Sequence, residues 1–278
     1  MKKIITLASL FFLLTATGCE RSEIVKDQFN YGDLKNISAA QWESISKIKI
    51  FFGHQSVGGN IVDGMKDVLK DYPQIKITII NSDKPQDLIP GIFEHYEIGR
   101  NEDPESKING FSKLVRLGIG NNADIAFFKF CYVDITASTN AEALFKNYQE
   151  TMEQLKKEYP DVKFIHFTVP LLRQPGKSIK SLIKNFLGRG DGFFDNSHNI
   201  ARNRYNELLK SAYEGKEPVF DLARLEAISP DKTLSFFNDQ GKQILSLCPE
   251  YTEDGGHLNA LGRKAVAEQL LVFLAGLK

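Results

Sequence analysis

Two short stretches, near opposite ends of the sequence, carry residue types that together can perform nucleophilic catalysis. In "FFGHQSVGG" an apolar run leads to Ser56 among glycines, and "DGGH" sets Asp254 three residues before His257. A serine hydroxyl is a weak nucleophile unless a neighbouring base removes its proton. Histidine suits that task, and an aspartate against its Nδ1 fixes the tautomer and stabilises the imidazolium. The three residues predict a Ser–His–Asp site.

Each stretch also has a simpler structural interpretation. Ser56 could merely cap a helix after a strand-to-helix turn, and for this stretch alone the two interpretations are evenly balanced. Asp254 could cap a turn beside an exposed His257, because D-x-x-H spacing is common. The two stretches follow the first core strand and precede the last helix of the chain, and these positions favour the catalytic interpretation.

The elements that must position these residues follow from apolar patterning. Apolar runs predict strands at residues 47–52, 75–80, 123–130, 162–170 and 218–223, and helical patterns alternate with them. Several runs are continuously apolar, which is typical of parallel strands covered on both faces. The sequence therefore predicts an α/β fold with a doubly wound parallel sheet. Residues 81–107 and 229–253 are expected to be irregular, and the first of these long segments to be a functional loop.

The N-terminal residues predict export and attachment to a membrane. Two lysines precede an apolar run, residues 4–14, that is too short to span a bilayer comfortably. "TATGC" resembles a bacterial lipobox, so residues 1–18 are expected to be a lipoprotein signal peptide and Cys19 the lipidated residue. The alternative is an ordinary signal peptide with a chance cysteine. Residues 19–45 are predicted to be a tether and a short helix, and residues 46–278 the catalytic domain. Glu20 favours the outer membrane, in the cell envelope, with lipid as the only membrane contact.

Composition excludes several other classes of protein. Without the two N-terminal lysines, 33 basic residues face 35 acidic ones, and no basic stripe suggests a nucleic-acid partner. The histidines lack metal-ligand spacing, so neither a metal nor a cofactor is expected. Besides Cys19, the chain has Cys131 and Cys248, which could form a disulfide or stay as buried thiols. The oligomeric state is left open.

The serine after the first strand and the Asp-x-x-His before the last helix resemble the SGNH (GDSL-type) hydrolase superfamily over residues 47–275. "GHQS" stands where "GDS" is usual, with Gln55 in place of the aspartate, and "DGGHLNALG" is close to the last block of that superfamily. The resemblance implies a flavodoxin-like three-layer α/β/α sandwich. It also implies that Ser56, Asp254 and His257 are nucleophile, orienting acid and base.

The resemblance is weaker at the oxyanion hole, the group of donors that stabilises the transition state. The Ser56 N–H and a glycine are implied as donors. Gly99 stands in the appropriate loop, and Gly110 is a weaker candidate. After the third core strand, the superfamily carries Gly-x-Asn-Asp, and its asparagine side chain is a further donor. Here Val133 occupies the position of the asparagine, and Asp134 occupies that of the aspartate. The residues that could replace the missing donor are Asn101, Lys129 and Tyr132.

The remaining polar residues receive less specific interpretations. Candidates for binding substrate are His54, Gln55, Tyr132 and Asp134, although His54 could equally stabilise a turn. His95 and His198 could line a cleft, whereas His166 is expected to be a hydrogen-bonded core residue. Residues 173–192 form a basic insertion that is expected to be a solvated flap, or alternatively a lid or a contact with an anionic glycan. Arg202 and Asn206 are expected to brace the loops of the site.

These observations predict a cell-envelope serine esterase acting on a small-molecule or glycan ester. A carbohydrate O-acetyl ester is one such substrate, suggested only by the expected location. The missing asparagine leaves an alternative, a non-catalytic glycan-binding lipoprotein on the same fold. Transfer of the acyl group to a sugar instead of water is a third possibility.

Overall fold

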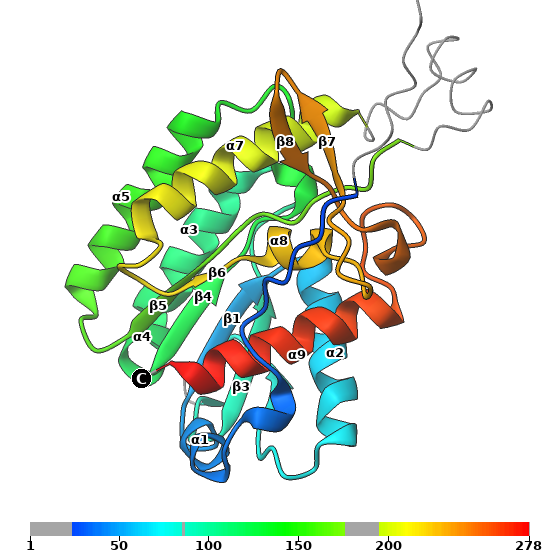
Figure 1. Cartoon of the computed structure of the whole chain (residues 1–278). Coiled ribbons are helices and arrows are strands. Elements are labelled where there is room, and N and C mark those ends of the chain that lie inside the picture. Colours follow the sequence, from blue (N-terminus) through cyan, green and yellow to red (C-terminus); the bar gives the residue numbers. More distant parts are fainter. Residues whose placement is uncertain (1–23, 85–86, 176–194, 278) are drawn as a thin grey trace, which may run out of the picture.

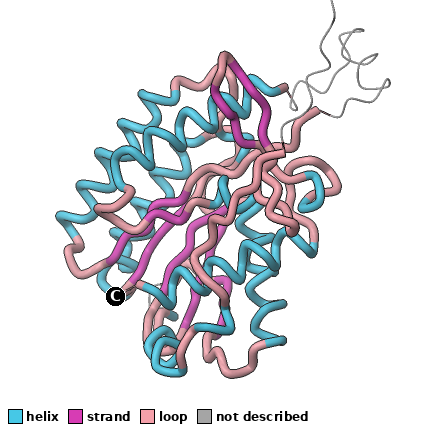
Figure 2. The backbone as a smooth tube through the Cα atoms, in the orientation of Figure 1, coloured by secondary structure: helices cyan, strands magenta, loops and turns pink. Residues whose placement is uncertain are grey.

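A doubly wound parallel sheet forms the centre of the protein. The computed structural model describes residues 24–84, 87–175 and 195–277 (Figure 1). Within them, six parallel strands pair in the order β2-β3-β1-β4-β5-β6. They are β1 (Ile50–His54), β2 (Thr78–Asn81), β3 (Ile92–Glu97), β4 (Ile125–Phe128), β5 (Lys163–Phe167) and β6 (Val219–Phe220). This sheet, with helices on both faces, confirms the predicted three-layer α/β fold (Figure 2).

Each face of the sheet packs against its own group of helices. Neighbouring residues of β1 point to opposite faces, so Phe51 and Phe52 lie in different hydrophobic clusters. The helices on the Phe52 face are α1 (Ala39–Ile45), α2 (Val57–Asp71), α8 (Leu222–Ala227) and α9 (Ala260–Gly276). Those on the Phe51 face are α3 (Pro104–Leu114), α5 (Ala141–Glu158) and α7 (Asn196–Tyr213). Both faces of β1 are therefore excluded from water.

The path of the chain places one edge of the sheet at the centre of the site. After β1 the chain adds β2 and β3 on one side, then crosses over and adds β4, β5 and β6 on the other. The carboxyl end of β1 is thus flanked by those of β3 and β4. Ligand sites of such sheets lie at this point, where the strand order reverses. The loops after β1, β3 and β4 meet there.

Two regions predicted to be irregular contain strands. β3 lies inside residues 81–107, and an antiparallel hairpin, β7 (Phe236–Asp239) with β8 (Lys242–Leu245), lies inside residues 229–253. The apolar pattern missed β3 because Glu94 and His95 interrupt it, although both side chains are buried. The hairpin strands are mostly exposed or half-buried and polar, so no apolar run marks them.

Residues before β1 pack closely on the domain. The Tyr31 ring stacks on Phe220 at 5.3 Å between centroids, and its hydroxyl accepts a hydrogen bond from Asp221 N–H and donates to the Val219 carbonyl. Ser38 is the N-cap residue of α1 and forms a capping box with Gln41. Cys19 and the lipobox lie outside the described residues, as does most of the insertion 173–192. Over the described ranges, no helix has the length and apolarity needed to cross a bilayer.

Both remaining cysteines, Cys131 and Cys248, are buried free thiols. The disulfide left open by the sequence is therefore not formed in this structure. Burial raises the pKa of the Cys248 thiol. The Cys131 thiol donates a hydrogen bond to the Gln55 carbonyl oxygen, 3.3 Å from its Sγ.

Candidate active site

A continuous chain of hydrogen bonds joins the three residues singled out by the sequence. Ser56 Oγ lies 2.8 Å from His257 Nε2, and His257 Nδ1 lies 2.7 Å from Asp254 Oδ2. The imidazole and carboxylate side chains keep 45% and 57% of their accessible surface. A substrate can therefore reach the serine and the histidine without displacing buried structure.

Close packing of α2 against α9 brings these residues together across 201 positions of sequence. A Cβ on Gly64 of α2 would lie 2.2 Å from the Arg263 carbonyl oxygen of α9, so only glycine permits this approach. Arg263 also binds Asp67 with its Nη2 2.7 Å from the carboxylate. The serine precedes α2 and the histidine precedes α9, so the two helix N-termini converge on the site.

Ser56 has the backbone conformation of a displayed residue. Its φ is 52° and its ψ is −114°, a region that residues with a Cβ rarely adopt. Although Ser56 is the N-cap residue of α2, its side chain makes no capping hydrogen bond and is bonded to His257. The helix-cap interpretation therefore does not describe the position of the hydroxyl.

The loop before His257 is fixed by Asp254. Its Oδ1 accepts hydrogen bonds from the N–H groups of Gly256 and His257 at 2.9 and 2.8 Å. Burial raises the pKa of this carboxyl, but the backbone donors and the imidazole outweigh it and bring the pKa to about 2. Asp254 is therefore an anion at neutral pH, with one oxygen fixing the loop and the other facing the imidazole. Asn60 of α2 adds a contact, accepting from Leu258 N–H at 3.2 Å.

Tyr132 covers the imidazole. Its hydroxyl lies 3.4 Å from His257 Nδ1 and 3.5 Å from Nε2, and the two rings meet edge to face. Burial raises the pKa of the phenol to about 12, so it stays protonated. Arg202 of α7 fixes the backbone here, donating from Nε to the Tyr132 carbonyl at 2.7 Å. The bracing expected of Arg202 is therefore observed, and that of Asn206 is too, through both backbone groups of Val169.

Two backbone N–H groups face no acceptor at the carboxyl end of β1. The N–H groups of Ser56 and Gly99 donate to no other group among the described residues. Gly99 has φ 59°, and a Cβ there would lie 2.6 Å from Lys107 N, so α3 approaches too closely for any other residue. Gly110, the weaker candidate, is a helix residue whose Cβ would lie 3.2 Å from Gly99 N. Gln55 ties the loops together by donating to the Gly99 carbonyl at 3.1 Å.

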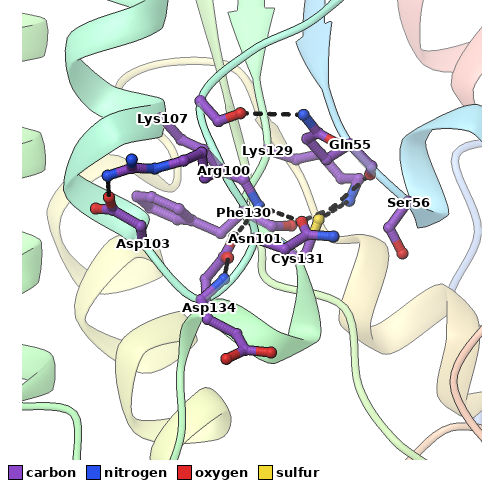
Figure 3. Close-up of polar contacts among 12 residues, drawn as sticks. Gln55, Ser56, Arg100, Asn101, Asp103, Lys107, Lys129, Phe130, Cys131 and Asp134 are labelled. Carbon is purple, nitrogen blue, oxygen red and sulfur yellow. Dashed lines mark hydrogen bonds and ion pairs between the residues drawn. The ribbon is translucent and has the colours of Figure 1, made fainter.

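Asp134 lies beneath the loop that carries Asn101. It is buried and accepts from Glu102 N–H, Cys131 N–H and Lys107 Nζ, at 2.9, 2.6 and 2.5 Å. Its contacts are thus with the protein itself and join the loops after β3 and β4. Asn101 is exposed, and its Oδ1 accepts from Lys107 Nζ at 2.9 Å (Figure 3).

The other histidines lie away from the three residues. His54 is buried with Nε2 3.0 Å from His95 Nδ1, and burial lowers the pKa values of these imidazoles to about 3 and 4. His54 and His95 therefore pair with each other across neighbouring strands, and both are buried. His166 is the predicted core residue, bonded to Tyr148 and Glu217. His198 accepts from Ala137 N–H, and no three ligating side chains cluster anywhere in the described ranges.

Comparison with protein-family models and with curated protein sequences gives no match for this chain. Among solved structures, one described as a GDSL-like lipase of Parabacteroides merdae is 12% identical, with a TM-score of 0.50 over 84% of this chain and 99% of its own. An acetyl xylan esterase is 18% identical, with a TM-score of 0.44 over 80% of this chain and 98% of its own. A structure described as a platelet activating factor of Streptococcus pneumoniae is 17% identical, with a TM-score of 0.45 over 87% of this chain and 92% of its own. The likeness to the first of these structures shows that this chain has an SGNH hydrolase-like fold.

Proposed function

We propose that this protein is a serine hydrolase that cleaves esters through Ser56, His257 and Asp254. One observation carries the proposal, namely the unbroken hydrogen-bond chain from the serine hydroxyl through the imidazole to the carboxylate. Its geometry is that required of a nucleophile, a general base and an orienting acid. The ester-hydrolase-like fold supports the same reaction class.

The proposed reaction has two halves. His257 Nε2 takes the proton of Ser56 as Oγ attacks the acyl carbon, and the imidazolium then gives that proton to the leaving alcohol. The ionised Asp254 stabilises the imidazolium meanwhile. Water, deprotonated by the same imidazole, then attacks the acyl-enzyme; the acyl–Oγ bond breaks, the imidazolium returns the proton to Ser56 Oγ, and the acid leaves. The N–H groups of Ser56 and Gly99 are proposed to donate to the carbonyl oxygen as it gains charge.

The proposal includes a substrate class and a location. A carbohydrate O-acetyl ester in the bacterial cell envelope is the proposed substrate, with the chain attached through lipid on Cys19. Only the N-terminal sequence, with "TATGC" at residues 15–19, supports the location. The imidazole is compatible with a bulky glycan, because 45% of its surface stays accessible beside Tyr132.

Labelling with a fluorophosphonate probe tests the proposal. Wild type is expected to be labelled and to hydrolyse p-nitrophenyl acetate, and Ser56→Ala to do neither. Ser44→Ala, an exposed serine on α1, is the matched control and should behave as wild type. Equal labelling of Ser56→Ala, or no labelling of folded wild type, would reject the hydrolase in favour of a glycan-binding protein. Product analysis with a sugar acceptor present separates hydrolysis from acyl transfer.

A further inference from the structure

The superfamily resemblance implies an asparagine in the loop after β4, but an apolar residue stands there instead. Val133 is half-buried and packs against the hydrophobic cluster on the Phe52 face. It can donate no hydrogen bond through its side chain. An amide side chain from a different loop reaches the same edge of the sheet. That residue is Asn101, in the loop after β3.

The amide of Asn101 is held in one orientation. Its Oδ1 accepts from Lys107 Nζ at 2.9 Å, and an ammonium group can only donate, so it must face the oxygen. The two N–H bonds of Nδ2 are left on the other side. Figure 3 shows the Asn101 side chain lying between Lys107 and Ser56, with its amide nitrogen on the side of the serine. Nδ2 donates to no group among the described residues.

Lys107 is itself fixed in place. Its side chain and that of Asp134 are both completely buried, with Nζ 2.5 Å from Oδ2. The other carboxylate oxygen accepts from Glu102 N–H, the residue next to Asn101. The pair therefore holds this loop at two points. Lys107 binds the side chain of Asn101, and Asp134 binds the backbone of Glu102. A buried charge pair tolerates little displacement, because separating the charges leaves each unpaired in a medium that solvates it poorly.

The other two candidates already have hydrogen-bond partners. Lys129 is fully buried, and its Nζ is bonded to the Phe130 carbonyl at 3.2 Å and lies 3.5 Å from Cys131 Sγ. The Tyr132 hydroxyl lies 3.4 and 3.5 Å from the two nitrogens of His257 and also hydrogen-bonds Ser56. Both residues are therefore engaged with protein groups, whereas Asn101 Nδ2 donates to none among the described residues.

We propose that Asn101 is the third donor of the oxyanion hole, and that the buried pair Lys107–Asp134 is the unit that positions it. This inference rests on the proposed function, because an oxyanion forms only if Ser56 attacks an acyl group. Asn101 touches the reacting oxygen and is a catalytic residue. Lys107 acts through Asn101 and is a positioning residue.

Three substitutions at one surface loop test the donor. Asn101→Ala is expected to lower kcat for p-nitrophenyl acetate by roughly 10²–10³-fold, with KM changed by less than about threefold, because the interaction exists only in the transition state. Asn101→Asp keeps an oxygen for Lys107 but has no side-chain N–H, so its kcat should be no higher than that of Asn101→Ala. Arg100→Ala, on the same loop with an exposed ion pair, is the control and should keep the wild-type rate. Full activity of either Asn101 variant would overturn the inference.

A double-mutant cycle tests the positioning unit. Lys107→Met should lower kcat about as much as Asn101→Ala, and combining the two should cost little more, because both remove one interaction. Additive losses, or a normal kcat for Lys107→Met, would overturn the role of Lys107. If Lys107→Met fails to fold, Lys107→Met with Asp134→Asn removes both charges and takes its place in the cycle.

Ser56→Ala separates this inference from the proposed function. If Ser56→Ala is inactive while Asn101→Ala is normal, the hydrolase stands and the donor is wrong. If Ser56→Ala keeps wild-type activity, the proposed function fails and the donor with it.

Discussion

Replacing Asp254 by asparagine should disable the imidazole without disturbing the loop. Oδ1 of Asp254 accepts from the N–H groups of Gly256 and His257, at 2.9 and 2.8 Å, and from the Thr252 hydroxyl at 3.2 Å. The asparagine oxygen must stay with these donors, since turning the amide would set its NH2 group against two N–H groups. The NH2 group then faces His257 Nδ1.

That orientation imposes the wrong tautomer. With a donor against it, Nδ1 must be unprotonated, so the proton of the neutral ring is on Nε2. Nε2 is the atom 2.8 Å from Ser56 Oγ and can then no longer accept the serine proton. The same exchange in serine proteases lowers kcat about 10⁴-fold, which corresponds to roughly 5.4 kcal/mol on the barrier. We expect a loss of this order for Asp254→Asn.

The assay is steady-state hydrolysis of p-nitrophenyl acetate at neutral pH, with thermal unfolding to show that the loop is intact. Glu253→Gln is the matched control, since it removes the same charge one residue earlier on an exposed side chain. It should leave kcat within about twofold. Folded Asp254→Asn with a kcat within tenfold of wild type would refute the argument from the tautomer.

Two further predictions concern stability. A Cβ on Gly58 would lie 2.3 Å from His54 Cβ, whereas a Cβ on Gly59 would meet nothing within 4 Å. Gly58→Ala should therefore lower the free energy of unfolding in urea by about 1–3 kcal/mol, and Gly59→Ala should raise it by about 0.5–1 kcal/mol. Equal effects of the two substitutions would contradict this. Burial lowers the pKa values of His54 and His95 to about 3 and 4, so the folded state resists protons that the unfolded state binds below about pH 6.5. The His54 contribution to stability should be full above that pH and about 3 kcal/mol smaller at pH 4. It is measured as the difference in free energy of unfolding between wild type and His54→Asn, because buried Glu94 and Glu226, with pKa values raised to about 7 and 8, act in the opposite direction in both proteins. A difference that stays unchanged between pH 7 and 4 would rule this out.

The sequence was sufficient to predict a parallel sheet because apolar runs mark five of its six strands, all but β3. Asp254 and His257 are close enough in sequence for their spacing to imply contact. Their partnership with Ser56 followed from strand order alone, since first and last loops meet at one edge of such a sheet.

The parts that were not predictable depend on contacts between distant residues. Lys107 belongs to an amphipathic helix, where a lysine usually faces solvent, and only Asp134 explains its burial. His54 had no visible partner because β3 was not predicted, and the register that pairs Phe52 with His95 could not be known. In both cases a polar residue interrupts an apolar pattern and is compensated by another polar residue far along the chain.

The topology explains how an oxyanion donor could move from one loop to another. β3 and β4 flank β1 in the sheet, so the loops that follow them approach Ser56 from either side of the same strand. A side chain from either loop can reach the acyl oxygen, provided that its backbone is held firmly. Asp134 follows β4 and yet binds both the Glu102 N–H and Lys107, so the carboxylate of one loop fixes the donor of the other. If Asn101 is the donor, as we propose, the Gly-x-Asn-Asp position can lack its asparagine because Asn101 supplies the hydrogen bond, while Asp134 is needed to position Asn101.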